Sequence, residues 1–289
     1  MHKLALGIAI YGAQYPDWWS ALLKLVATLP GLGIDFKGVL TASSMLTDSN
    51  RNLIVKSFLN ETTADWLFWL DADNRLPDGG LKRLLDINKT MVSALYYAKR
   101  EPHTPIAYGR AKDGMYIPIS DPAIVKRWER GEVVPIDAAG MGCLLTHRSV
   151  YEDIQKNYVT ARDGNGRTHS IHRGDINGKL PDEIPADKFA GQVYKGSLRL
   201  PLRNWDWKEK GVFPFFLFGG GRTEDMHFFE TAYRVGHKCW LDTSVEADHI
   251  SEKHYTGEDY RRLHEGDRYI TEIPYQPLAE RIEVLNALP

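Results

Sequence analysis

The chain has 289 residues, of which 43% are hydrophobic and 26% charged, and its formal net charge is -2. This length is enough for one large α/β domain with an extension, and the near-neutral charge excludes a global attraction to nucleic acid or anionic membranes. The longest apolar runs, such as Leu4 to Tyr11, are far shorter than the roughly 20 residues of a membrane-spanning helix. No signal-peptide pattern opens the chain. We therefore expect a soluble, cytoplasmic protein without membrane-spanning segments.

The two cysteines, Cys143 and Cys239, both lie in apolar, strand-like stretches. This placement favours reduced, buried thiols over a disulfide framework or a metal site.

Apolar runs and helical periodicities alternate along the first hundred residues. Lys3 to Tyr11 predicts a strand, and Asp17 is expected to cap the helix that follows. A second strand is expected at Ile34 to Thr41, a helix around Leu53, and a third strand at Trp66 to Leu70. The order β, α, β, α, β predicts a parallel sheet with helices on both faces and ligand binding at the carboxyl ends of its strands.

Later elements are less regular. Ile136 to Thr146 is expected to be a strand whose glycines let another backbone or a ligand come close. A helix is expected at Arg148 to Asn157, another from Thr223 to about Val235, and a closing strand at His237 to Leu241.

Residues 158–212 predict a long irregular excursion. Between Arg162 and Lys210 it carries ten Lys or Arg against seven Asp or Glu, together with Trp205 and Trp207. An ordinary solvated loop explains this composition, and so does a functional lid on the acceptor side.

The first candidate site is Asp71-Ala72-Asp73, directly after the third strand. With 22 Asp in the chain, chance alone gives roughly 1.7 Asp-x-Asp pairs, so only the position at a strand end is informative. Mg²⁺ and Mn²⁺ favour such carboxylates together with substrate phosphates. The alternative is a pair of turn or helix-capping residues.

Two further candidates lie near the end of the domain. Glu224 and Asp225 open a helix after Gly219 to Gly221, where one of them would serve as a general base, although acidic residues also open ordinary helices. His249 follows a strand and is either structural or a metal ligand.

In this order, these stretches resemble nucleotide-sugar-dependent glycosyltransferases of the GT-A fold, similar to glycosyltransferase family 2. The matching segments are Ser49-Asn50-Arg51-Asn52-Leu53, Trp66 to Asp73, Ala139 to Leu145, Glu224-Asp225, Gly236-His237-Lys238 and His249. The resemblance covers residues 3–250, apart from the excursion. It implies a GT-A (Rossmann-like) mixed sheet with helices on both faces in a domain at 1–250, with the insertion at 158–212 and a packed C-terminal extension at 251–289.

The resemblance also implies site roles. Asp73 and His249 would bind Mn²⁺ or Mg²⁺, with Asp71 contacting the metal through water or the donor ribose, and Asp225, beside Glu224, would be the catalytic base. The remaining donor-side residues would be Tyr11, Gly12, Thr41, Ser43, Arg51 and Ala72. The acceptor side would comprise Gly140, Met141, Gly142, Trp205 and Trp207.

Some features depart from the family. The first strand lacks the usual proline, and the second strand has no acidic residue at the position that often contacts the nucleotide base. The identity of the nucleotide is therefore not fixed, and a UDP-sugar is expected. No Gln-x-x-Arg-Trp follows Asp225, which favours a single sugar transfer over processive synthesis. Asp225 as base implies inversion, whereas a positioning role would permit retention.

The acceptor is expected to be a glycan or a hydroxylated base in DNA. The alternative functions are a GT-A-like nucleotidyltransferase acting on a sugar phosphate and a non-catalytic sugar-nucleotide binding protein. Such nucleotidyltransferases usually carry a basic, glycine-rich loop after the first strand, and residues 11–17 contain no Lys or Arg.

Overall fold

The computed structural model describes residues 1–10, 15–44, 46–112, 114–120, 125, 128, 131–162, 168–176, 183–185, 199–201, 211–218, 222–251 and 256–258. Tyr11, Gly12, Trp205 and Trp207 lie outside these residues, as does nearly all of the extension at 251–289.

The centre of the fold is a seven-stranded mixed sheet. In spatial order its strands are β2 (Ile34–Ser43), β1 (His2–Ile10), β3 (Trp66–Leu70), β10 (Cys143–His147), β5 (Met91–Leu95), β15 (Cys239–Glu246) and β8 (Val133–Ile136). Strand β1 pairs in parallel with β2 and β3, as the β, α, β, α, β order predicts. Strand β10 inserts antiparallel between β3 and β5, and β8 pairs antiparallel with β15. The mixed sheet confirms the predicted fold class and is consistent with a GT-A-like fold.

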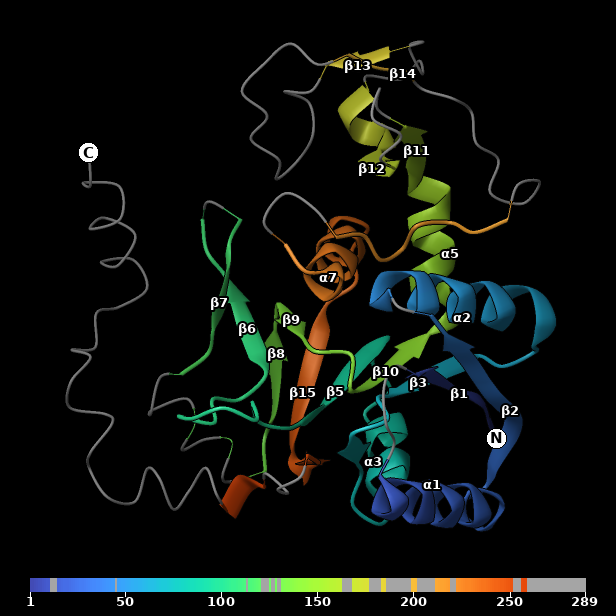
Figure 1. Ribbon diagram of the computed structural model, residues 1–289, viewed down its shortest axis with the longest axis vertical. Helices are drawn as coiled ribbons and strands as arrows, with labels where there is room; N and C mark the ends of the chain where they lie inside the picture. Colours follow the sequence, from blue (N-terminus) through green and yellow to red (C-terminus); the bar gives the residue numbers. More distant parts are fainter. Residues whose placement is uncertain are drawn as a thin grey trace.

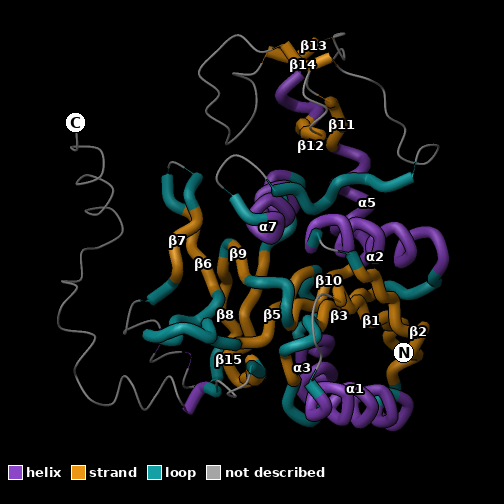
Figure 2. Tube along the Cα trace, viewed as in Figure 1, coloured by secondary structure: helices purple, strands orange, loops and turns teal. Residues whose placement is uncertain are grey.

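Helices cover both faces of this sheet, as predicted (Figure 1). On one face lie α1 (Pro16–Thr28) and α3 (Gly80–Asp86), and on the other lie α2 (Thr47–Glu61), α5 (Arg148–Asn157) and α7 (Glu224–Arg234). Each face has its own hydrophobic core: Trp18 and Leu84 belong to one, Phe58 and Phe228 to the other. Figure 2 shows the same layers with the sheet between the two groups of helices.

Strand β3 explains why an unbroken apolar run leads to the carboxylates. Its five residues are all buried, and because side chains alternate along a strand, Leu67 and Trp69 enter one core while Phe68 and Leu70 enter the other. The Trp69 indole N–H donates to the Tyr151 hydroxyl at 2.8 Å, which satisfies its polar atom inside the core. The run ends where the sheet ends, at Asp71.

Helix boundaries follow local chemistry with one correction. Asp17 does not cap α1: Tyr15 occupies the cap position, Pro16 is the first helical residue, and Asp17 lies in the first turn. Proline suits that first position because the amide it lacks would have no helical partner there. Thr223 does cap α7, accepting a hydrogen bond from the Met226 amide, as predicted.

The predicted strand at 136–146 is interrupted. Its residues divide among the end of β8, the short β9 (Ala138–Ala139) and β10, with Gly140 to Gly142 between the last two. Strand β9 joins β6 (Ala107–Arg110) and β7 (Tyr116–Pro118) in a separate three-stranded sheet. The chain changes sheets at these glycines.

The described part of the excursion contains regular structure, which corrects the expectation of an irregular loop. Strands β11 (Tyr158–Arg162) and β12 (Thr168–His172) form an antiparallel hairpin, followed by a 3₁₀ helix at Arg173–Ile176. Strands β13 (Glu183–Pro185) and β14 (Arg199–Pro201) also pair.

Both cysteines are free and buried, as predicted. Burial raises the pKa of each thiol, so both stay protonated at neutral pH. Across the described ranges, no helix combines the length and the apolar character needed to span a membrane.

Candidate active site

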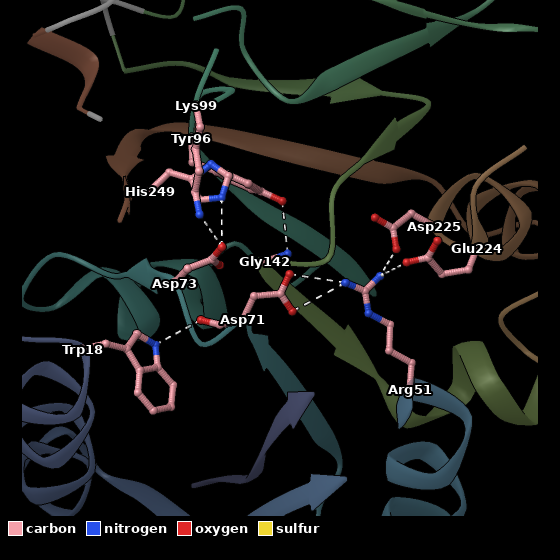
Figure 3. A network of polar contacts seen from close by, with 10 residues as sticks. All are labelled: Trp18, Arg51, Asp71, Asp73, Tyr96, Lys99, Gly142, Glu224, Asp225 and His249. Atoms are coloured by element: carbon pink, nitrogen blue, oxygen red, sulfur yellow. Dashed lines mark hydrogen bonds and ion pairs between the residues drawn. The ribbon is translucent and has the colours of Figure 1, made fainter. Parts of the chain in front are cut away.

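Asp71 begins a rigid loop at the carboxyl end of β3. Its backbone N–H donates to the Gly142 carbonyl at 3.0 Å. Its backbone carbonyl accepts from the Trp18 indole N–H and from the backbone N–H of Asn74, each at 3.0 Å. Figure 3 shows the Trp18 contact reaching the loop from α1. These bonds fix the backbone from which the Asp71 and Asp73 side chains project.

Asp73 lies beside His249, as the pairing of two short strands dictates. Strand β4 (Asn74–Arg75) pairs antiparallel with β16 (Asp248–His249), and the Ile250 amide donates to the Asp73 carbonyl at 2.6 Å. The Asp73 Oδ2 atom is 3.5 Å from His249 Nε2 and 2.5 Å from Lys99 Nζ (Figure 3).

The orientation of His249 suits a metal ligand. Its Nδ1 lies 2.8 Å from the Tyr97 carbonyl oxygen, and since a carbonyl can only accept, Nδ1 carries a proton. In the neutral ring, Nε2 then directs a lone pair at the Asp73 carboxylate, a geometry that a shared cation satisfies. Burial favours a higher pKa for Asp73, but the contacts with a His249 ring that donates from Nε2 and with Lys99 outweigh it and hold that pKa below its usual value; the lone-pair arrangement belongs to the neutral ring alone.

A buried guanidinium joins the predicted donor side to the predicted base. The side chain of Arg51 is 3% exposed, and its Nη2 lies 3.3 Å from Asp71 Oδ2. Its Nη1 lies 3.2 Å from Glu224 Oε1 and forms an ion pair with Asp225 (Figure 3). Asp71, which follows β3, and Glu224 and Asp225, which open α7, thus all contact the guanidinium of one residue of α2.

Burial shifts the proton affinity of this cluster. It raises the pKa of Asp71 and of Glu224 above their usual values, although the neighbouring Arg51 opposes both shifts. Each carboxyl therefore holds a proton more readily than an exposed one does.

Three consecutive polar residues on α2, Asn50 to Asn52, are all buried, and each has a positional role. The Asn50 amide donates to the Ser44 carbonyl at 3.3 Å, next to the carboxyl end of β2. The Asn52 amide donates to the Phe216 carbonyl at 2.8 Å and accepts from the Phe216 amide at 2.9 Å. Together with Arg51, these residues tie three loops of the site to one helix.

Gly140 and Gly142 make room for the protein's own side chains. A Cβ at Gly140 would lie 2.1 Å from the Tyr96 hydroxyl, and one at Gly142 would lie 2.3 Å from the Asn74 side-chain oxygen. The Tyr96 hydroxyl also accepts from the Gly142 amide at 3.1 Å (Figure 3). Met141, which lies between them, is buried in the core. The groups that come close to these glycines are therefore side chains of the same chain, those of Tyr96 and Asn74.

The other predicted donor residues lie nearer the edge of the sheet. Thr41 and Ser43 are exposed on β2, the edge strand, opposite Ile8 and Ile10 of β1. Ala72 packs against the core on the α1 face.

The charges of the site leave an excess that a divalent cation would balance. The four carboxylates of Asp71, Asp73, Glu224 and Asp225 face two permanent cations, Arg51 and Lys99, so the cluster carries a formal charge of −2 with neutral His249. Among the described residues, no group of three or more His, Cys, Asp or Glu side chains is arranged so that it could hold a metal ion. Sites that hold Mg²⁺ or Mn²⁺ commonly supply one or two protein ligands and leave the rest to phosphates and water, which fits Asp73 and His249.

No local signal in the sequence points to Lys99, Tyr96 or Trp18. Each reaches the site from an element far along the chain from its partner, across the sheet or from α1. A lysine after a strand and a tryptophan in a helix are too common to single out.

The sequence matches no protein-family model and no curated protein. Among solved structures, A197 from STIV aligns with a TM-score of 0.49 and 15% identity over 90% of this chain and 92% of that chain. GalNAc-T7 with UDP, GalNAc and Mn²⁺ aligns with a TM-score of 0.40 and 11% identity over 99% of this chain and 54% of that chain. Mannose-1-phosphate geranyltransferase from Thermus thermophilus aligns with a TM-score of 0.32 and 15% identity over 54% of this chain and 61% of that chain.

Proposed function

We propose that the chain is a metal-dependent glycosyltransferase that moves one sugar from a nucleoside diphosphate sugar, with UDP-sugar expected, to an acceptor hydroxyl. The observation that carries this proposal is the pair formed by Asp73 and His249, in which Nδ1 of the ring lies 2.8 Å from the Tyr97 carbonyl oxygen and Nε2 faces the Asp73 carboxylate at 3.5 Å. Kinship with glycosyltransferase family 2, which rests on the ordered motifs, belongs to the same proposal.

Asp73 and His249 would hold Mn²⁺ or Mg²⁺, with Asp71 contacting it through water or binding the donor ribose. When bound, the cation would neutralise the diphosphate and stabilise the charge that develops on it as it leaves. The exposed Thr41 and Ser43, with Tyr11 and Gly12, would line the nucleotide side.

Asp225 would act as the base. It takes the proton of the acceptor hydroxyl while the acceptor oxygen bonds to the anomeric carbon, and the bond from that carbon to the diphosphate oxygen breaks. Attack opposite the leaving group inverts the anomeric configuration. If Asp225 only positions the sugar, the configuration is retained, and the stereochemistry of the product separates these two cases.

Arg51 supports this assignment as a positioning residue. Its guanidinium contacts Asp71 on the donor side and Asp225 on the base side, so one rigid group sets the separation between the two reacting partners. Glu224 contacts the same guanidinium nitrogen as Asp225, Nη1, and would help to hold that end of the group in place.

The acceptor would be a glycan or a hydroxylated base in DNA. Binding to DNA would weaken steeply as salt rises, because phosphate contacts release counterions, whereas glycan binding would be nearly insensitive to salt. Acceptor binding measured at low and moderate salt separates the two.

The proposal is tested by incubating the chain with a panel of nucleoside diphosphate sugars and acceptors, with Mn²⁺, with Mg²⁺ and with a chelator. We expect metal-dependent release of nucleoside diphosphate, and Asp73→Asn should lower the rate by about 100-fold. Asp78→Asn removes an exposed carboxylate paired with Lys24 outside the cluster and should retain full activity. Full activity of Asp73→Asn in chelator would refute the proposal. Release of pyrophosphate in a parallel incubation with a nucleoside triphosphate and a sugar phosphate would indicate a nucleotidyltransferase.

A further inference from the structure

Lys99 occupies the carboxylate oxygen that the proposed cation would need. Its Nζ lies 2.5 Å from Asp73 Oδ2, the same atom that faces His249 Nε2 at 3.5 Å. In Figure 3 the Lys99 and His249 side chains converge on this carboxylate. About a third of each partner in the ion pair is exposed, 32% of Lys99 and 31% of Asp73, so the ammonium can leave without crossing the core.

The backbone holds Lys99 at this position. The turn that follows β5 is closed by a bond from the Ala98 amide to the Thr104 carbonyl at 2.9 Å and by one from the His103 amide to the Arg100 carbonyl at 2.9 Å. His103 Nδ1 also lies 2.9 Å from the Ala98 carbonyl oxygen. Lys99 therefore projects from a fixed turn.

The same segment sets the orientation of the proposed metal ligand. The carbonyl that accepts from His249 belongs to Tyr97, two residues before Lys99. The placement of the lysine and that of the histidine are therefore coupled through one short stretch of chain.

An ammonium and a divalent cation cannot share one carboxylate oxygen, because like charges at such distances repel strongly. We propose that Lys99 is an internal counter-ion of Asp73 that a divalent cation displaces, and that the released ammonium then binds the diphosphate of the donor. This proposal rests on the function proposed above. The flexible four-carbon stem of lysine allows the exchange of partners from a fixed backbone.

The exchange couples the two ligands of the site. The cation alone must break the Lys99–Asp73 pair, whereas cation and diphosphate together give the ammonium a new partner. Each ligand therefore raises the affinity for the other, and the coupling is reciprocal.

The test measures binding of Mn²⁺ alone and of UDP at saturating Mn²⁺, by calorimetry, in the full chain and in Lys99→Met. Methionine keeps most of the stem but removes the charge. We expect Lys99→Met to bind Mn²⁺ alone roughly three- to tenfold more tightly and UDP about as much more weakly, in line with the loss of one ion pair. Lys99→Arg, which keeps the charge, should restore part of the UDP affinity.

The matched control is Arg100→Met, which removes an exposed cation from the neighbouring position of the same turn. It should change neither affinity. Weaker or unchanged Mn²⁺ binding by Lys99→Met, with a melting temperature equal to that of the parent, would overturn the proposal. Unchanged UDP affinity would also overturn it.

These readouts do not depend on turnover. A chain that shows the expected shifts in Mn²⁺ and UDP affinity but transfers no sugar would refute the proposed function alone. A chain that transfers sugar but whose Mn²⁺ and UDP affinities ignore Lys99 would refute the counter-ion role alone.

Discussion

Asn52 and Phe216 are 164 residues apart in sequence, yet the Asn52 side chain satisfies both backbone polar groups of Phe216. Both residues are buried. One amide side chain thus takes the place of a neighbouring strand for the segment around Phe216.

Asn52→Ala should lower the free energy of unfolding by about 2 kcal/mol, because it leaves a buried N–H and a buried C=O without partners. Urea denaturation measures the change. Leu53→Ala, on the same helix at a side chain that is 44% exposed, is the control and should cost less than about 0.5 kcal/mol. Equal costs for the two variants would mean that Asn52 does not hold the segment.

Arg51→Met should destabilise the protein by about 3 kcal/mol at neutral pH, because it leaves several carboxylates close together around one buried position without their cation. The folded-state pKa values of Asp71 and Glu224, already raised by burial, should then rise further. A carboxyl whose folded pKa exceeds its unfolded pKa adds stability below the unfolded value and loses it as pH rises through the folded value. The deficit of Arg51→Met, measured by denaturation from pH 7 down to pH 4, should therefore shrink with falling pH; a constant deficit would contradict this account.

Gly140→Ala should destabilise the protein by about 2 kcal/mol, since the new methyl group would overlap the Tyr96 hydroxyl. Tyr96→Phe removes that oxygen and, in the double variant, should recover part of the loss, although contact with Ile106 remains. A double-mutant cycle from thermal denaturation measures the coupling. Strict additivity would show that the Tyr96 hydroxyl is not what excludes a side chain there.

His227 predicts how stability changes in mild acid. Its Nδ1 lies 3.0 Å from the Phe215 carbonyl oxygen, and burial lowers its pKa from 6.5 to about 4, even though this hydrogen bond favours the charged ring. Between these two values the unfolded chain binds a proton that the folded chain does not, so stability should fall as pH decreases from about 6.5 to about 4 and level off below.

His227→Gln keeps a hydrogen-bond donor without a titrating ring and should flatten this part of the stability curve. Free energies of unfolding at half-unit pH intervals test the prediction. A variant with the same slope as the parent would assign the acid sensitivity to other groups.

Local patterns were sufficient to predict the first half of the fold. Apolar runs and helical spacings predicted β1, β2 and β3 with the helices between them, and Arg148 to Asn157 is a helix as expected. The insertion of β10 between β3 and β5 could not be predicted, because which strands pair over long separations is decided by tertiary packing. For the same reason the break at Gly140 depends on Tyr96 and Asn74, which local sequence does not reveal.

The site was predicted in part. Asp73 and His249 do lie side by side, and Asp71, Glu224 and Asp225 do gather, but at Arg51, which was expected to face the donor and here contacts these carboxylates. Whether Arg51 also meets the donor stays a prediction, as do the roles of Tyr11, Gly12, Trp205 and Trp207. Lys99 could not be found from sequence because its contact with Asp73 depends on a turn and a sheet edge meeting in space.

The pairing of β4 with β16 also affects when the site can form during synthesis. Arg75 and Asp248, which face each other across these strands, are 173 residues apart. A ribosome exposes Asp71 and Asp73 early, but the strand that brings His249 to them emerges only after nearly the whole described domain, and contacts of such long separation form late. The nascent chain therefore carries its acidic loop without its histidine until the sheet is almost finished, which keeps incomplete chains from assembling the site.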